Sequence, residues 1–208
     1  MEKTCLIISG GEFVNLPEEI LRADKVIACD MGLDHADRYG ILTDMVVGDF
    51  DSVSPANKER ILNDEVAYIR YPKEKDDTDT MIAMRLALEE GYRDIRMVCV
   101  FGKRMDHTFS NIQTACYGAK AGALVRMYDK DTEVLVFSNR TITITGVEGD
   151  SLSVFSLTDE SRGVTIKGTK YELEDAVLSN SFPLGQSNEF GDDTALVGVK
   201  EGILMVIK

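Results

Sequence analysis

The chain has 208 residues, of which 44% are hydrophobic, so it can bury a core as one large domain or two small ones. Its 36 acidic residues outnumber its 23 basic ones and give a formal net charge of −13. This acidity argues against nucleic-acid binding, which needs a basic surface to neutralise phosphates. No apolar run approaches the roughly 20 residues that span a bilayer, and the N-terminus lacks a signal-peptide pattern. We therefore expect a cytoplasmic protein that binds neither nucleic acid nor membranes.

The four cysteines indicate neither disulfides nor a zinc site. Cys5, Cys29 and Cys99 lie in apolar runs typical of strands, and Cys116 lies in a helical pattern. The sequence contains no Cys-x-x-Cys spacing, and its two histidines are far apart along the chain. We expect all four to be reduced, buried thiols.

Two apolar strands are predicted near the N-terminus, over residues 3–9 and 26–29. The first ends in the turn Ser9-Gly10-Gly11, whose small residues would let backbone amides approach a phosphate. The second ends at Asp30, before a predicted helix over 33–39. Asp30 can accept a hydrogen bond from a ribose hydroxyl or cap that helix, and the sequence leaves both readings open.

The third predicted strand, over residues 45–47, leads directly into Asp49 and Asp51. Residues two apart in an extended segment point the same way, so both carboxylates can face one side of the chain. Pro55 then opens a predicted helix, which places the two acids at the carboxyl end of a strand, where open α/β sheets bind ligands. Carboxylate pairs of this kind suit Mg²⁺, which completes its coordination with water and substrate phosphates.

A second acidic cluster follows a predicted strand over residues 66–69. Asp76, Asp77 and Asp79 stand at the start of a helix predicted over 78–89, and Asp76 or Asp77 is expected to be its N-cap. One acid would satisfy the cap. Three acids within four residues repel one another unless a cation binds between them, so the cluster favours a second contribution to a metal site.

The next predicted strand, over residues 95–100, is followed by Arg104, Asp106 and His107 at the start of a helix. The Arg104 guanidinium is suited to bidentate binding of phosphate. Asp106 can cap the helix or hold Arg104, and His107 is either a packed helix residue or a general base. With a last strand over 123–127, the alternation of strands and helices predicts a doubly wound, mostly parallel, Rossmann-like sheet.

The pattern changes after residue 126. Alternating polar and apolar residues over 141–145 and 151–157, and an apolar run over 203–207, predict antiparallel strands separated by glycine-containing turns. We therefore predict an α/β domain over residues 1–126 and an antiparallel β-sandwich domain over 127–208.

These motifs, taken together and in this order, resemble the thiamine pyrophosphokinase family over the full length of the chain. The segments that carry the resemblance are Gly48-Asp49-Phe50-Asp51-Ser52, Lys75-Asp76 with Thr78-Asp79, Gly102-x-Arg104-x-Asp106-His107 with Asn111, and Ser187-Asn188. The resemblance implies transfer of the terminal diphosphate of ATP to the hydroxyl of thiamine, giving thiamine diphosphate and AMP. It also implies a homodimer, whose α/β domain binds ATP and whose β-sandwich domain closes the thiamine cleft of the partner.

The resemblance assigns roles to individual residues. Those implied in catalysis are Asp49, Asp51, Asp76, Asp79, Arg104 and Asp106, with Mg²⁺ held by Asp49, Asp51 and Asp79. Those implied in ATP binding are Gly10, Gly11, Asp30, Gly32, Lys75, Thr78, Arg104, His107 and Asn111. Ser187 and Asn188 are implied in thiamine binding, and either Asp76 or Asp106 orients the thiamine hydroxyl or takes its proton.

The aromatic residue that packs on thiamine stays open. Some members of the family use a tryptophan, which this chain lacks, and Tyr171 and Phe190 are the candidates. Two other functions fit part of the pattern: a pyrophosphokinase for another primary alcohol, such as a hydroxymethylpterin, and a non-enzymatic nucleotide-binding protein. Ser187-Asn188 argues against the first, and the number of converging carboxylates argues against the second.

Overall fold

The structure, a computed structural model, describes residues 3–71, 76–102 and 104–208. It divides into two compact units. The first takes the chain up to Gly118 together with Val125–Asp131, and the second takes Ala119–Leu124 with Thr132–Lys208. The predicted boundary between residues 126 and 127 falls within strand β6 (Leu124–Tyr128).

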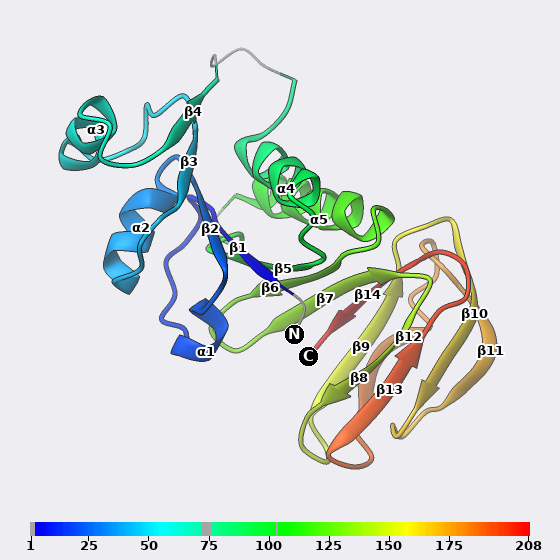
Figure 1. Ribbon diagram of the computed structural model, residues 1–208. Helices are drawn as coiled ribbons and strands as arrows, with labels where there is room; N and C mark the ends of the chain where they lie inside the picture. The colour runs from blue at the N-terminus through cyan, green and yellow to red at the C-terminus, as the bar shows by residue number, and fades with distance from the viewer. Residues whose placement is uncertain (1–2, 72–75, 103) are drawn as a thin grey trace. The chain divides into compact units, whose positions relative to one another are not determined.

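The strands of the first unit form a sheet in the order β6-β5-β1-β2-β3-β4 (Figure 1). Their bounds are β1 Thr4–Ile8, β2 Lys25–Cys29, β3 Met45–Gly48, β4 Tyr68–Arg70 and β5 Asp94–Val98. From β5 to β4 every neighbouring pair is parallel. All five residues of β1 are buried, as expected for a central parallel strand covered on both faces.

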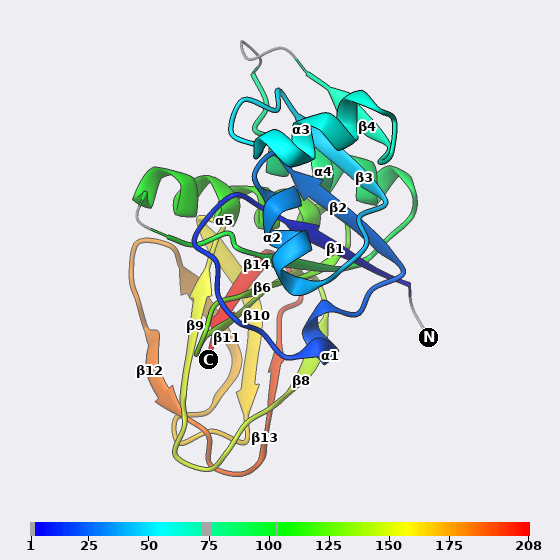
Figure 2. The same cartoon turned by 90° about the vertical axis from the view of Figure 1, so that its left-hand side faces the viewer.

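Helices cover both faces of this sheet (Figures 1 and 2). They are α1 Glu18–Leu21, α2 Gly32–Tyr39, α3 Pro55–Leu62, α4 Asp79–Glu89 and α5 Met105–Lys120. The figures place α2 and α3 on one face and α4 and α5 on the other. The prediction of a doubly wound parallel sheet is therefore confirmed. Within the described residues, no helix combines the length and apolar character needed to cross a bilayer.

Most predicted strands match the observed ones to within one residue at each end, and two differ by two residues. The fifth strand was expected to reach residue 100, but β5 ends at Val98 because Cys99 adopts a left-handed conformation, with φ of 54°. The fourth strand was expected from residue 66, but Val66 is buried in a core cluster and β4 begins at Tyr68. In both cases backbone geometry and packing decide what the apolar pattern leaves undetermined.

The second unit is built from two antiparallel groups of strands, in the orders β12-β9-β14-β7 and β11-β10-β13-β8. Their bounds are β7 Glu133–Ser138, β8 Thr141–Thr145, β9 Ser151–Ser156, β10 Glu160–Lys167, β11 Leu173–Ser179, β12 Gly185–Glu189, β13 Thr194–Gly198 and β14 Ile203–Ile207. Phe137 and Leu204 from one group share a buried cluster with Ile166 and Val197 from the other. The prediction of a β-sandwich is therefore confirmed.

Candidate active site

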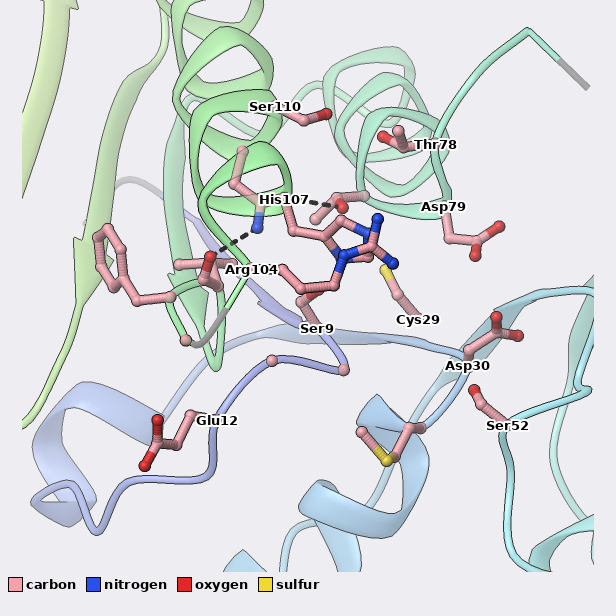
Figure 3. A pocket seen from close by; sticks show the side chains of 18 residues that line it. Ser9, Glu12, Cys29, Asp30, Ser52, Thr78, Asp79, Arg104, His107 and Ser110 are labelled. Atoms are coloured by element: carbon pink, nitrogen blue, oxygen red, sulfur yellow. Dashed lines mark hydrogen bonds between the residues drawn. The ribbon is translucent and has the colours of Figure 1, made fainter.

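A cleft of about 610 Å³ lies at the carboxyl ends of the parallel strands in the first unit. Its walls come from the turn after β1, the end of β2, the start of α4, the loop after β5 and the first turns of α5. Figure 3 shows Asp30 and Asp79 on the same side of this cleft, and Arg104 and His107 reaching into it from the segment that opens α5.

Three carboxylates converge beside the cleft. Asp30 follows β2, Asp49 and Asp51 follow β3, and one oxygen atom from each lies within 4.8 Å of the others. The predicted pair Asp49 and Asp51 is thus brought together with Asp30, which the sequence had suggested for ribose binding or capping. Asp30 also takes part in holding the acidic segment, because its Oδ1 accepts a hydrogen bond from the Phe50 amide at 2.9 Å.

Gly48 makes this convergence possible. Its φ is 149°, a conformation that L side chains rarely adopt. A Cβ atom at this position would lie 1.9 Å from Asp30 Oδ1. Any side chain here would displace the Asp30 carboxylate from Phe50, so the glycine is required by close approach.

The electrostatics of the cluster favour a bound cation. Burial raises the pKa of Asp30 to about 7; the Phe50 hydrogen bond opposes this increase, and the nearby carboxyls of Asp79 and Asp49 add to it. Crowded carboxylates of this kind are the donor set that a hard divalent cation stabilises. The residues present therefore fit Mg²⁺, with Asp30, Asp49 and Asp51 as its ligands. Asp79, predicted as a ligand, lies beside Asp30.

The second acidic cluster begins α4 in a different way from the one expected. Thr78 is the N-cap, and its Oγ1 accepts a hydrogen bond from the Met81 amide at 3.2 Å. The prediction of Asp76 or Asp77 as N-cap is wrong, because Asp77 instead pairs with Arg85 at 2.5 Å. Asp76 is exposed, and Thr78 and Asp79 line the cleft. Lys75, predicted to contact phosphate, lies outside the described residues.

Asp106 holds the Arg104 side chain, which confirms one of the two roles predicted for it. The Arg104 guanidinium donates to both oxygens of Asp106, from Nε at 3.2 Å and from Nη2 at 2.6 Å. These bonds lower the pKa of Asp106 to about 2. Both side chains are exposed, and Arg104 lines the cleft together with His107. This arrangement presents a fixed cation to an anionic ligand.

Asn111, predicted to contact ATP, lines the cleft but uses its amide within the protein. Its Oδ1 accepts from Thr80 Oγ1 at 3.0 Å, and its Nδ2 donates to the Val100 carbonyl at 2.6 Å. These bonds join α4, α5 and the loop after β5. Asn111 therefore shapes this wall of the cleft.

The glycine turn after β1 also differs from the expected phosphate cradle. The amides of Ser9, Gly11 and Glu12 donate to the carbonyls of Val98, Cys99 and Phe101, respectively, at 2.8 to 3.0 Å. The turn therefore continues the hydrogen bonding between β1 and the β5 end. Gly10 and Gly11 line the cleft, and a Cβ at Gly11 would lie 2.3 Å from the Cys99 carbonyl.

The α2 helix packs closely under this turn. Gly32 is buried, and a Cβ there would lie 2.0 Å from the Ile8 carbonyl. The position thus requires glycine for the approach of α2 to β1. Behind the turn, His35 Nε2 lies 3.0 Å from the Gly11 carbonyl. Since a carbonyl only accepts, Nε2 carries the proton in this bond.

The predicted thiamine residues lie in the second unit, on β12. Ser187 is exposed and has φ of 56°. Asn188 is buried; its Oδ1 accepts from the Tyr171 amide at 3.0 Å and its Nδ2 donates to the Tyr171 carbonyl at 2.7 Å. Asn188 therefore holds the loop that carries Tyr171. The Tyr171 side chain is 64% exposed, whereas Phe190 is 2% exposed and belongs to the core, so only Tyr171 presents its ring to a ligand.

Several cleft residues are not among the predicted site residues, although Ser9 and Ser52 lie within predicted motifs. Ser9, Glu12, Cys29, Ser52 and Ser110 all line the cleft. Serine and glutamate are common on any surface, and only their nearness to strand ends could have suggested these positions.

Asp49 and Asp51 also line a smaller hollow of about 320 Å³, which contains basic side chains from Lys58 and Arg70.

Comparison with known proteins gives a consistent result over both units. Residues 16–127 match the family described as "Thiamin pyrophosphokinase, catalytic domain", and residues 139–204 match "Thiamin pyrophosphokinase, vitamin B1 binding domain". The sequence is 29% identical to thiamine pyrophosphokinase of Bacillus subtilis over 210 residues, covering 99% of this chain and 98% of that protein.

Solved structures agree with this match. The crystal structure of thiamine pyrophosphokinase from Bacillus subtilis superposes with a TM-score of 0.86 at 26% identity, covering 99% of this chain and 98% of the other. The structure of thiamin pyrophosphokinase from Geobacillus thermodenitrificans gives a TM-score of 0.82 at 26% identity, covering 98% and 96%.

Proposed function

The chain belongs to the thiamin pyrophosphokinase family, and we propose that its cleft transfers the terminal diphosphate of ATP to the hydroxyl of thiamine, giving thiamine diphosphate and AMP. Asp30, Asp49 and Asp51 converge beside a cleft that Arg104 enters. This convergence is the observation that supports assigning the function to individual residues. A cleft of about 610 Å³ is large enough to take a nucleotide.

We assign the cation site to Asp30, Asp49 and Asp51, with Asp79 as a neighbour that adds negative charge. Bound Mg²⁺ would neutralise the phosphate oxygens and fix their position, which is the principal need of phosphoryl-type transfer. The crowding of carboxylates around Asp30 supports this assignment, since their repulsion is relieved by a cation.

Other residues around the cleft are proposed to bind the phosphates and to accept the hydroxyl proton. Arg104, held by Asp106, binds the negatively charged phosphates of ATP. The thiamine hydroxyl oxygen then attacks the β-phosphorus, the bond from that phosphorus to the oxygen shared with the α-phosphate breaks, and AMP leaves with that oxygen. The hydroxyl proton must also be lost. Asp106 is a poor acceptor because of its low pKa, so we assign it to holding Arg104 and leave Asp76 as the candidate base.

Thiamine recognition is proposed for the second unit of a homodimeric, cytoplasmic enzyme. Ser187 offers an exposed hydroxyl, Tyr171 offers an exposed ring, and Asn188 holds the two together through its bonds to the Tyr171 backbone. The resemblance to the family supports a site that the partner subunit completes.

Acceptor specificity tests the proposal. Purified protein is supplied with ATP, Mg²⁺ and either thiamine or a hydroxymethylpterin, and AMP is measured. We expect AMP with thiamine and only background AMP with the pterin. AMP release with the pterin alone would identify a different pyrophosphokinase, and no AMP with either would leave a nucleotide-binding protein without transfer activity.

A further inference from the structure

The segment that carries Asp49 and Asp51 is attached to α2 at two points. At its start, the Phe50 amide donates to Asp30, which lies two residues before α2. At its end, the Ser54 amide donates to Asp34 Oδ2 at 3.0 Å, one turn further along α2. Asp51 therefore lies between the two attached residues, and Asp49 directly precedes the first of them.

The second attachment is built around a half-buried carboxylate that does not itself reach the cluster. Asp34 Oδ1 accepts from Asn57 Nδ2 at 2.8 Å, while Oδ2 accepts from Ser54. Burial acts to raise the pKa of Asp34, but hydrogen bonds from Ser54 and Asn57 outweigh it and lower the pKa overall. Asp34 is consequently ionised at neutral pH and accepts charge-assisted hydrogen bonds, which are stronger than neutral ones.

Asn57 extends this attachment into α3. Its side chain is only 2% exposed, and its amide nitrogen also donates to Asp37 at 2.7 Å. Its amide oxygen accepts from Arg60 at 2.6 Å, so both polar atoms of the side chain are used. A polar network satisfied around a buried side chain such as Asn57, although its partners Asp37 and Arg60 are partly exposed, favours one arrangement of its elements. Here it fixes the start of α3, and hence the end of the acidic segment, against α2.

We propose that Asp34 and Asn57 are positioning residues for the cation site, holding Asp49 and Asp51 at the distance from Asp30 that one shared divalent cation requires. The inference rests on the proposed function, because it takes the three acids to be the cation ligands. Partners that orient metal ligands commonly contribute 10- to 100-fold to metal affinity, so losing the Asp34 attachment is expected to weaken cation binding by about 10-fold or more.

Two changes break the attachment without touching a ligand. Asp34→Asn removes the negative charge of the side chain. It also leaves one oxygen as a hydrogen-bond acceptor, whereas the carboxylate accepts with both, from Ser54 and from Asn57. Ser54→Pro replaces the amide proton with a ring carbon and removes the hydroxyl, so residue 54 can no longer donate to Asp34. Ser54 already has φ of −60° and ψ of 154°, which suit proline before Pro55. Ser54→Ala loses the hydroxyl but keeps the amide, and is the matched control for the proline variant.

A further control covers general loss of stability. Asp94, in the same unit, also has a half-buried carboxylate that accepts hydrogen bonds, from Arg126 and Thr4 on the sheet. Asp94→Asn therefore removes a comparable carboxylate at a place that does not support the acidic segment.

The test is a titration of each full-length protein with Mn²⁺ in the absence of nucleotide, with free Mn²⁺ measured by electron paramagnetic resonance. We expect Asp34→Asn and Ser54→Pro to bind Mn²⁺ at least about 10-fold more weakly than the parent, and Ser54→Ala and Asp94→Asn to bind like the parent. The Mg²⁺ concentration for half-maximal AMP formation should rise in the same two variants, and excess Mg²⁺ should restore their rate.

Each outcome bears on one claim. Equal Mn²⁺ affinity in Ser54→Pro and Ser54→Ala overturns the positioning role while leaving the cation site intact. If Asp34→Asn does not fold, the comparison of these two Ser54 variants still tests the positioning role. A rate loss in Asp34→Asn that excess Mg²⁺ does not restore also overturns it. A parent protein that binds no Mn²⁺ overturns the cation assignment in the proposed function, and the inference with it.

Discussion

Replacing Asp30 by Asn should make the metal-free protein more stable at neutral pH. The change removes the charge that repels Asp49 and Asp79 and keeps an oxygen that can accept from the Phe50 amide. Asparagine also tolerates the left-handed backbone of this position, where φ is 46°. The expected sign is opposite to that of most single substitutions, which lower stability.

The sign follows from the pKa of Asp30, which is about 7 in the folded state against an ordinary aspartate value of 3.8 in the unfolded chain. Between these values the folded protein holds a proton that the unfolded chain has lost, so stability falls as pH rises through this window. A full shift of this size corresponds to about 4 kcal/mol. Because the carboxylate is only half-buried and solvent screens it, we expect about 1 to 2 kcal/mol.

The assay is thermal unfolding in chelator at several pH values. At pH 8 Asp30→Asn should melt several degrees above the parent, since each kcal/mol corresponds to about 2 to 4 °C for a chain of this size. The difference should shrink below pH 7 and vanish below about pH 3, where Asp30 is protonated in both the folded and the unfolded parent. Mg²⁺ should then raise the melting temperature of the parent more than that of the variant. A variant that melts below the parent at pH 8, or a difference that does not change with pH, would refute the convergence of charges.

Three other predictions follow from the same site. Asp51→Asn should lower the rate of AMP formation by several orders of magnitude while the far-ultraviolet circular dichroism stays native, and near-normal turnover at modest Mg²⁺ would exclude Asp51 as a ligand. Gly48→Ala should weaken Mn²⁺ binding and activity, because its Cβ would lie 1.9 Å from Asp30 Oδ1; unchanged Mn²⁺ affinity would contradict the close approach. A Ser187→Ala, Asn188→Ala double variant mixed with Asp51→Asn should regain part of the activity after subunit exchange, because mixed dimers hold one intact site, and no recovery after demonstrated exchange would place the site within one chain.

Much of the fold could be predicted from the sequence because its signals are local. Continuous apolar runs predict buried parallel strands such as β1, and the change to alternating residues after residue 126 predicts the β-sandwich. The pair Asp49 and Asp51 was predicted as a cation site from its spacing in an extended segment, but both acids lie beyond β3 and the intervening Phe50 is left-handed, with φ of 67°.

The parts that could not be predicted depend on backbone conformation and on contacts distant in sequence. Asp30 joins the cation cluster because Gly48 lets its carboxylate approach Phe50, which no local pattern indicates. Thr78 caps α4 in place of the neighbouring acids, because Asp77 pairs with Arg85 eight residues away. The attachment of Ser54 to Asp34 spans 20 residues and has no sequence signature.

The central claim is that the three converging acids support transfer of a diphosphate group to thiamine. The most direct measurement quantifies all nucleotide and thiamine products after incubation of the parent protein, and of Asp30→Asn, Asp49→Asn and Asp51→Asn, with ATP, thiamine and Mg²⁺. We predict AMP and thiamine diphosphate in equal amounts with the parent, no product when Mg²⁺ is chelated, and strongly reduced product with each variant. ADP with thiamine monophosphate, or undiminished AMP formation by all three variants, would contradict it.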